Sequence, residues 1–272
     1  MAGSKVVLVT GASSGIGRAT AERLAARGHR VVGTSRRDSP GEAPWSWAVL
    51  DVTDETSVAA CVAGVLAFHG RIDAVVNNAG LVMAGAVEDT TMDEARLSFE
   101  TNVFGAMRLA RAVLPGMRAR GSGTIVNMGS LAGRVGMPFQ GIYSASKFAL
   151  EGLTEALAQE VAAFGITVAL VAPGDTATPV VDNRVRSAGS RDPASPYAAA
   201  CARVVAMYER DERAGAPADR VAALVTAIVD GQRRGPRHVV GPFAQRVMVA
   251  SRGVVPGGIF QWGMARYFGL GR

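Results

Sequence analysis

Short apolar runs rich in β-branched residues alternate with longer segments of helical periodicity over the first three quarters of this chain. Successive runs are far enough apart for a crossover helix, and such spacing favours parallel strands joined by helices over hairpins. The expected strands are Val6–Thr10, Arg30–Ser35, Trp47–Asp51, Ala74–Asn77, Gly123–Met128, Thr167–Ala172 and His238–Gly241. The expected helices are Arg18–Arg27, Thr56–Phe68, Met92–Arg118, Tyr143–Phe164, Tyr197–Arg210 and Ala218–Gln232. The alternation predicts an α/β fold in three layers, with helices on both faces of a doubly wound parallel sheet.

The length of 272 residues suits one large α/β domain, and we expect a single domain over residues 1–272. At about residues 174–215 the composition shifts to Asp, Thr, Pro, Ser and Arg, which indicates a substrate-binding insertion. A basic extension with glycines and aromatic residues follows at about residues 242–272.

Cys61 and Cys201 are the only cysteines, and they lie far apart in apolar or helical stretches. This usage indicates neither a disulfide framework nor a metal site. The first apolar run is too short for a signal peptide, and no run is long enough to span a membrane. We therefore expect a cytoplasmic protein.

The net charge is +6, but seven arginines and no acidic residue lie between Gly231 and Arg272. The rest of the chain is nearly neutral, which argues against nucleic acid as a partner. Apolar and aromatic residues accompany the arginines of this tail. They favour an active-site cap or an oligomer contact, with weak binding to an anionic membrane as the alternative.

A glycine-rich turn, Thr10–Gly17, follows the first expected strand and opens the first expected helix. Its small residues allow backbone N–H groups and the positive end of a helix to approach a pyrophosphate. The spacing G-x-x-x-G-x-G differs from the commoner fingerprint, but its context predicts a dinucleotide site. The second strand is followed by Arg36 and Arg37 instead of an acid. Guanidinium groups bind phosphate, so this pair favours NADP(H) over NAD(H).

Two further strand ends carry residues that could contact the dinucleotide. Asp51 and Val52 end the third strand and can hold an adenine edge, and Asn77–Gly80 end the fourth strand beside the expected nicotinamide ribose. Ligands of open parallel sheets bind beyond the carboxyl ends of the strands, so we expect these clusters to meet at one site.

Tyr143 and Lys147 stand four residues apart, on one face of an expected helix. The chain has 27 arginines and only two lysines. Because lysine is so rare here, Lys147 indicates a functional group rather than an ordinary surface charge. A nearby cation lowers the pKa of a phenol, and we expect Lys147 to bring Tyr143 into range for acid–base chemistry. Ser130 follows the strand Gly123–Met128 and can hydrogen-bond a substrate oxygen.

These motifs resemble the short-chain dehydrogenase/reductase family, in its compact single-domain branch. The resemblance covers about residues 4–240 and rests on Thr10–Gly17, Asp51, Asn77–Gly80, Asn102, Ser130, Tyr143, Lys147 and Pro173-Gly174 with Thr178. It implies a Rossmann fold and an NADP(H)-dependent oxidoreductase that interconverts a ketone or aldehyde and an alcohol. It also implies that Tyr143 is the general acid or base, that Lys147 binds the nicotinamide ribose, and that Ser130 orients the reacting oxygen.

In the same resemblance Asn102 anchors a proton-relay water, and Thr178 lies near the nicotinamide carboxamide. The expected catalytic residues are Asn102, Ser130, Tyr143 and Lys147. The expected cofactor-binding residues are Gly11, Ser13, Ser14, Gly15, Ile16, Gly17, Arg36, Arg37, Asp51, Val52, Asn78, Ala79, Gly80, Tyr143, Lys147, Pro173, Gly174, Thr176 and Thr178. Two departures from the family pattern are Asp175, where an apolar residue is usual, and Met128-Gly129 before Ser130; Asp175 puts the polarity of the substrate in doubt.

Within the family, the stretch from Ser130 to Leu153 looks most like the 17β-hydroxysteroid and retinol dehydrogenase-like branch. This likeness implies a lipophilic carbonyl or alcohol substrate of steroid-, retinoid- or polyketide-like character. The expected pocket residues are Leu131, Val135, Met137, Phe139 and Gln140. Family habit further implies a homodimer or homotetramer. A non-catalytic NADP-sensing regulator on the same fold, and a redox step that serves dehydration or epimerisation, are the alternatives.

Overall fold

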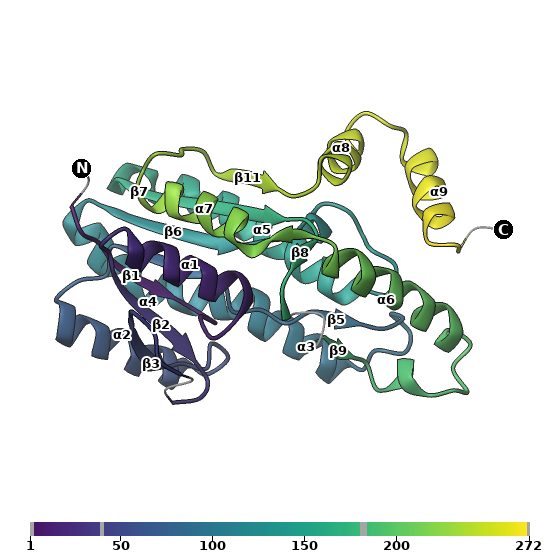
Figure 1. Ribbon diagram of the computed structural model, residues 1–272, viewed down its shortest axis with the longest axis horizontal. Helices are drawn as coiled ribbons and strands as arrows, with labels where there is room; N and C mark the ends of the chain where they lie inside the picture. The colour runs from purple at the N-terminus through teal and green to yellow at the C-terminus, as the bar shows by residue number, and fades with distance from the viewer. Residues whose placement is uncertain (1–2, 39–40, 180–183, 271–272) are drawn as a thin grey trace.

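A computed structural model describes residues 3–38, 41–179 and 184–270 of the chain. Its centre is a seven-stranded sheet of order β11-β7-β6-β4-β1-β2-β3, in which every neighbouring pair is parallel (Figure 1). The strands are β1 Val6–Val9, β2 Arg30–Ser35, β3 Ser46–Val49, β4 Ala74–Asn77, β6 Gly123–Met128, β7 Ile166–Pro173 and β11 Arg237–Val240. The order reverses between β1 and β4, as in doubly wound folds, so the predicted fold class is confirmed.

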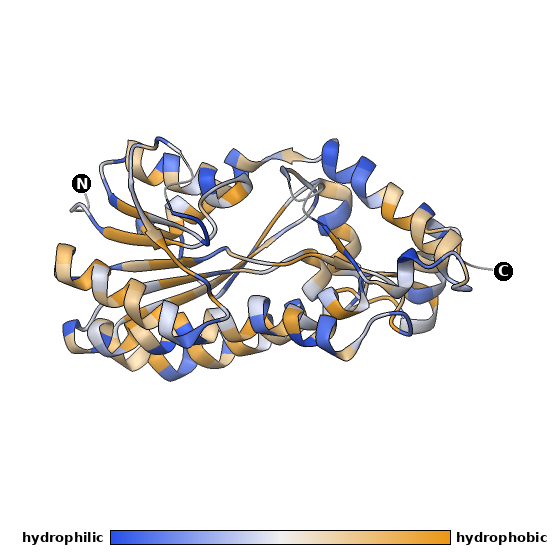
Figure 2. Ribbon diagram, turned by 90° about the horizontal axis from the view of Figure 1, so that it is seen from below, coloured by the Kyte–Doolittle hydropathy of each residue, from blue (hydrophilic) through white to orange (hydrophobic). Residues whose placement is uncertain are grey.

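Helices cover both faces of this sheet, as Figure 2 shows from below. They are α1 Gly15–Ala26, α2 Glu55–His69, α3 Met92–Phe99, α4 Gly105–Arg120, α5 Gly141–Val161, α6 Ala198–Arg213, α7 Ala218–Val229, α8 Phe243–Ser251 and α9 Gly257–Tyr267. Residues of α2, α4 and α5 belong to one core layer, and residues of α1 and α7 belong to the other.

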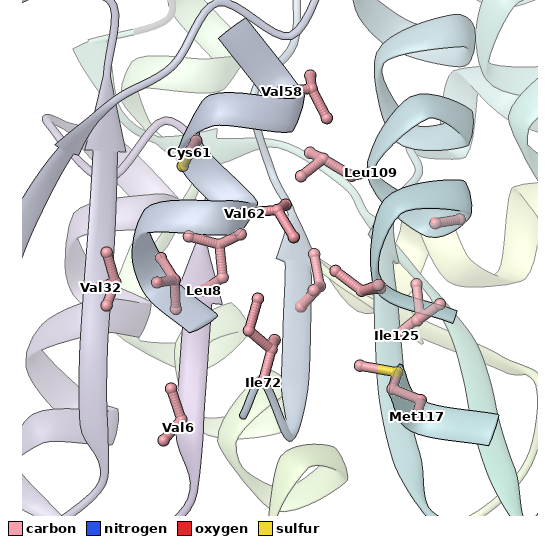
Figure 3. Packing of buried hydrophobic residues seen from close by; sticks show 14 of the residues in the cluster. Val6, Leu8, Val32, Val58, Cys61, Val62, Ile72, Leu109, Met117 and Ile125 are labelled. Atoms are coloured by element: carbon pink, nitrogen blue, oxygen red, sulfur yellow. The ribbon is translucent and has the colours of Figure 1, made fainter. Parts of the chain in front are cut away.

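Successive side chains of β1 point to opposite faces of the sheet and pack in both core layers. Val6 and Leu8 join the layer with α2, α4 and α5, while Val7 and Val9 join the layer with α1 and α7. Figure 3 shows Val6 and Leu8 among the packed side chains of the first layer. A strand that is buried on both faces must be apolar at every position, which explains the uninterrupted run that predicted it. This packing fixes the carboxyl end of β1, where the glycine-rich turn begins.

The expected helix Met92–Arg118 is wrong as one continuous helix. A π-helical turn at Glu100–Phe104, in which the N–H of Gly105 donates to the carbonyl of Glu100, separates α3 from α4. The expected helix Tyr143–Phe164 ends in a short 3₁₀ turn at Ala162–Phe164. Helical periodicity cannot reveal either feature, because a single wide or tight turn barely changes which residues face the core.

Two pairs of very short strands were not expected. β5 Met83–Ala84 pairs with β9 Val185–Arg186, and β8 Thr176–Ala177 pairs with β10 Ala216–Pro217. Two of these four strands, β8 and β9, belong to the segment at about 174–215, and β10 follows that segment directly. Residues 180–183 of that segment lie outside the described residues.

The C-terminal arm, α8 and α9, follows the carboxyl end of β11 and reaches α6 (Figure 1). Met248, Val249, Phe260 and Met264 of this arm cluster with Leu131, Val135 and Met137. Phe268, just after α9, is buried against Tyr208 of α6. Residues 271–272 of the expected extension lie outside the described residues. Among the described helices, none combines the length and apolar character needed to cross a membrane.

Candidate functional site

The glycine-rich turn between β1 and α1 is shaped by backbone conformation. Gly11 and Gly15 have positive φ angles of 63° and 55°, which side chains disfavour. A Cβ atom on Gly17 would collide with the carbonyl oxygen of Gly11 and the side-chain nitrogen of Asn78. The turn therefore depends on glycine at these three positions, and its backbone is open to close approach by a ligand.

Hydrogen bonds join this turn to the end of β4. The hydroxyl of Thr10 accepts from the N–H groups of Asn78 and Ala79, each at 2.9 Å. The side-chain amide of Asn78 donates to the carbonyls of Thr10, at 2.9 Å, and Gly11, at 3.2 Å. The expected residues Asn78 and Ala79 thus lie against the turn, as the strand-end argument predicted.

The N-terminus of α1 is open. Ser14 occupies the N-cap position without a side-chain hydrogen bond to the helix, and Ser13 and Ser14 are both exposed. Ile16 is partly buried against the sheet layer that holds α1. The first N–H groups of a helix need acceptors and attract anions, so this end fits a pyrophosphate group.

Arg36 and Arg37 are exposed directly after β2, and Asp51 lies nearby at the end of β3. The carboxylate of Asp51 accepts from the backbone N–H of Thr53 at 2.9 Å and from its hydroxyl at 2.7 Å. These bonds, with the charges of Arg36 and Arg108, hold the pKa of Asp51 below its ordinary value. The side chain of Val52 is buried against Gly105 of α4. A ligand at this position could therefore contact only the backbone of Val52.

Asn102 stands in the π-helical turn and is only 2% exposed. Its Oδ1 accepts from the N–H of Leu81 at 2.8 Å, and its Nδ2 donates to the carbonyl of Leu81 and the hydroxyl of Ser146, each at 2.9 Å. The side chain therefore ties the loop after β4 to α5. Both hydrogens of Nδ2 are used, so a water at Asn102 can bind the second lone pair of Oδ1 or the backbone.

Lys147 is 6% exposed on α5, and its Nζ donates to the carbonyl of Met128 at 2.8 Å. Burial lowers the pKa of Lys147 to about 8. A Cβ atom on Gly80 would lie 3.2 Å from Oδ1 of Asn102 and 3.6 Å from Nζ of Lys147, so glycine leaves this ammonium accessible. The expected residues Gly80, Asn102 and Lys147 are brought together.

Tyr143 lies one turn before Lys147 on α5, with Nζ of Lys147 5.8 Å from the centre of its ring. Burial raises the pKa of Tyr143, while a hydrogen bond with the side chain of Ser130 acts in the opposite direction. The pKa of Tyr143 is thus raised, whereas we expected Lys147 to lower it, because burial outweighs the interactions that lower it. Ser130 also accepts from the N–H of Ala132 at 3.1 Å, which fixes its side chain.

The segment after β7 contacts the glycine-rich turn between β1 and α1. A Cβ atom on Gly15 would lie 3.3 Å from Cβ of Thr178, and the hydroxyl of Thr176 donates to the carbonyl of Gly174 at 2.9 Å. Pro173 and Gly174 are partly buried at the end of the strand. The structure therefore places Thr178 beside the glycine-rich turn.

Asp175 is held by Gln245 of α8, whose Oε1 accepts from the backbone N–H of Asp175 at 3.0 Å and whose Nε2 donates to its carboxylate. Burial raises the pKa of Asp175. Sequence reasoning did not find Gln245, because nothing in its neighbourhood marks it and 70 residues separate the two partners.

Of the expected pocket residues, Leu131 and Val135 are buried beneath the C-terminal arm. Phe139 packs against Ala84 and α6, and Gln140 is the buried N-cap residue of α5. Phe139 has a φ of 56°, the only positive φ of a non-glycine residue in the described chain. Sequence reasoning also missed a charged pair, Arg184 and Glu212, whose charges act on Tyr143.

Known proteins share this arrangement. A family model described as short chain dehydrogenase matches residues 5–188. A 3-ketodihydrosphingosine reductase from Bacteroides thetaiotaomicron is 39% identical over 268 residues, which are 98% of each chain.

Two solved structures also match over most of their length. The crystal structure of a short-chain dehydrogenase from Streptomyces avermitilis has a TM-score of 0.82 and 36% identity, covering 98% of both chains. A short chain dehydrogenase/reductase from Burkholderia phymatum in complex with NAD has a TM-score of 0.80 and 29% identity, covering 92% of this chain and 93% of that one. With the open helix end, the glycine turn and the buried lysine at one edge of the sheet, these matches show that the chain belongs to the short-chain dehydrogenase family of oxidoreductases, which bind a nicotinamide dinucleotide.

Proposed function

We propose that this protein is an NADP(H)-dependent oxidoreductase that interconverts a ketone or aldehyde and an alcohol, with Tyr143 as general acid and base. The observation that carries the proposal is the convergence of Tyr143, Ser130 and Lys147 where β4 and β6 end, at the edge of the parallel sheet from which α1 also begins. A proton donor, a hydrogen-bonding hydroxyl and an ammonium group serve the reacting oxygen of such a substrate and the ribose of the coenzyme.

The chain's own residues perform the proton transfer. The bound coenzyme supplies or accepts the hydride. Because burial raises the pKa of Tyr143, its phenol holds its proton at neutral pH and can donate it to a carbonyl oxygen as that oxygen gains negative charge. The hydrogen bond from Ser130 orients the phenol, and Lys147 offers Nζ to the ribose hydroxyls. In the oxidative direction the same proton returns to Tyr143.

The coenzyme preference rests on Arg36 and Arg37. Both side chains are exposed beyond β2, and Arg36 acts electrostatically on Asp51 at the next strand end. Two guanidinium groups favour the additional phosphate of NADP(H). The Burkholderia relative holds NAD in its crystal, so both coenzymes must be compared directly.

Apolar residues near the segment before Tyr143 support a lipophilic substrate. A hollow of about 480 Å³ lies beside the segment before Tyr143 and is lined by Val87, Phe139 and Leu270 among others. The Bacteroides relative is named for a reduction of 3-ketodihydrosphingosine, which agrees with a ketone substrate. We therefore propose steroid-, retinoid- and polyketide-like ketones as candidate substrates.

The segment at about 174–215 and the C-terminal arm are proposed to enclose that substrate within one domain. Exposed apolar side chains on α4 and α5, among them Met107 and Phe148, support assembly of the chain as a homodimer or homotetramer. A cytoplasmic location remains part of the proposal.

The test measures oxidation of NADPH and NADH with steroid, aromatic, polyketide-like and small aliphatic carbonyl compounds. We expect turnover with at least one lipophilic ketone and a kcat/KM for NADPH about tenfold or more above that for NADH, because a bidentate phosphate contact is worth about 1.5–3 kcal/mol. Replacing Arg36 and Arg37 by Gln should remove this preference. Equal use of both coenzymes by the unmodified protein would contradict the NADP(H) assignment.

A further inference from the structure

Arg184 is a buried cation with unused hydrogen-bond donors. Its side chain is 2% exposed, and its Nη2 donates to Oε2 of Glu212 at 2.5 Å. Its Nε and Nη1 have no hydrogen-bond partner among the residues that the structure describes. A buried donor without an acceptor costs about 1–3 kcal/mol, so a ligand that supplies the acceptor would recover this loss.

Arg184 packs on α6 beside the segment that leads to Tyr143. Its guanidinium carbon stands 6.0 Å from the ring centre of Tyr208, and the hydroxyl of Tyr208 donates to the carbonyl of Pro138, in the segment that leads into α5. The charge of Arg184 acts on Tyr143, Tyr208, Asp175 and Glu212. The N–H of Gly215 donates to the carbonyl of Glu212, and the N–H of Ala216 donates to the carbonyl of Asp175, each at 3.0 Å, so Asp175 adjoins the end of α6 that holds Arg184.

The charges around Arg184 limit what can bind there. Glu212 already balances the guanidinium, and Asp175 adds a second, partly buried carboxylate. A carboxylate or phosphate ligand would bring further negative charge into this buried group and has no proton to give to Asp175. An ammonium group has no lone pair for Arg184 to bond. A hydroxyl group can accept from the guanidinium and donate to a carboxylate at once.

We propose that Arg184 and Asp175 bind an uncharged hydroxyl group next to the reacting carbonyl, so that the substrate is a hydroxy ketone with an apolar body rather than a plain ketone or a keto acid. This inference rests on the proposed reductase function and adds the polar end of the substrate to it. Arg184 is then a specificity-determining residue, which selects the substrate without taking part in hydride or proton transfer.

The experiment compares three ketones of one chain length with NADPH: a hydroxy ketone, its deoxy counterpart and the corresponding keto carboxylate. We expect kcat/KM for the hydroxy ketone to exceed both others by about tenfold or more, since the unpaired donors penalise a substrate without an acceptor. Equal rates with the deoxy ketone, or a preference for the keto carboxylate, would overturn the inference and leave the reductase function standing. NADPH oxidation with none of the three would instead refute the reductase function.

A double variant, Arg184→Met with Glu212→Gln, removes the donors without leaving a buried charge unpaired. We expect the hydroxy-to-deoxy ratio of kcat/KM to fall to near one. The matched control is Arg186→Met with Glu209→Gln, a neighbouring pair between β9 and α6 that is 3.2 Å apart and 40% and 29% exposed. The control should keep the ratio of the unmodified protein. An unchanged ratio in the first variant would overturn the role of Arg184, and if that variant does not fold, the comparison of substrates with the unmodified protein decides.

Discussion

Two titratable side chains on α5, the buried Lys147 and the partly buried Tyr143, depart from their ordinary pKa values for the same physical reason. Burial disfavours the charged form, so it lowers the pKa of Lys147 to about 8 and raises that of Tyr143. Only one described hydrogen bond, to the carbonyl of Met128, compensates the ammonium of Lys147. Lys147 therefore carries a charge whose burial the fold compensates only in part.

Replacing Lys147 by Met should stabilise the ligand-free protein at neutral pH by about 1–2 kcal/mol. Below pH 8 the lysine is charged in both states, and the folded state bears the full cost of burial. Between about pH 8 and 10.5 the folded protein has lost the proton and the unfolded chain still holds it, so the stability of the unmodified protein rises with pH. Thermal unfolding should show the advantage of the variant shrinking across that range.

Lys5→Met is the control, because Lys5 is the only other lysine and is partly exposed at the start of the sheet. It should give no comparable gain. A Lys147→Met variant that is less stable than the unmodified protein at every pH would contradict the account of this charge.

At the scale of elements, the strands were predictable and the turns that shape the site were less so. β2, β4 and β6 have the bounds that the sequence predicts, because strands buried on both faces leave an uninterrupted apolar run. The π-helical turn before α4 was not predictable, since its geometry follows from bonds between Asn102, Leu81 and Ser146. Asp175 was noticed as unusual, but its partner on α8 could not be found from sequence.

The glycine-rich turn between β1 and α1 gives the prediction at this scale. Gly17→Ala places a Cβ against backbone and side-chain atoms of Gly11 and Asn78 that also hold β4. We expect coenzyme affinity to fall at least tenfold and the protein to lose about 1–3 kcal/mol of stability. Fluorescence titration with NADPH and thermal unfolding measure the two effects.

Gly64→Ala in α2 provides the matched control. No atom lies within 4 Å of its added Cβ, and alanine favours a helix interior over glycine. This variant should keep its coenzyme affinity and gain up to about 1 kcal/mol of stability. Equal coenzyme binding by both alanine variants would show that the close approach at Gly17 is not required.

For the whole molecule, the C-terminal arm explains what the basic tail does within the fold. Met248, Val249, Phe260 and Met264 pack on the segment between Ser130 and Tyr143, while the arginines of the arm face outward or lie at its edge. This packing agrees with the interpretation of the C-terminal arm as an active-site cap. That the arm contacts the substrate stays a prediction. Sequence could indicate that the tail is apolar and basic, but not which residues it covers, because those lie more than 100 residues earlier in the chain.

Phe268 anchors the end of this arm and is 3% exposed against Tyr208. Phe268→Ala should weaken docking of the arm by about 3 kcal/mol. We expect faster proteolysis within α8 and α9 and a raised KM for lipophilic ketones, with NADPH affinity unchanged. Trp262→Ala, at a position that is 63% exposed, should change neither measurement. An unchanged KM in a Phe268→Ala variant whose arm is cleaved would rule out the cap.

The central claim is that Tyr143 transfers the proton to a substrate oxygen at a site whose coenzyme cradle is built by other elements. Tyr143→Phe removes one hydroxyl and leaves the ring, the glycine-rich turn and Lys147 in place. The decisive measurement combines NADPH titration with the rate of ketone reduction for this variant. The account predicts a Kd for NADPH within about twofold of the unmodified protein and a fall in kcat of about a hundredfold or more. Retention of ketone turnover by the phenylalanine variant would contradict it.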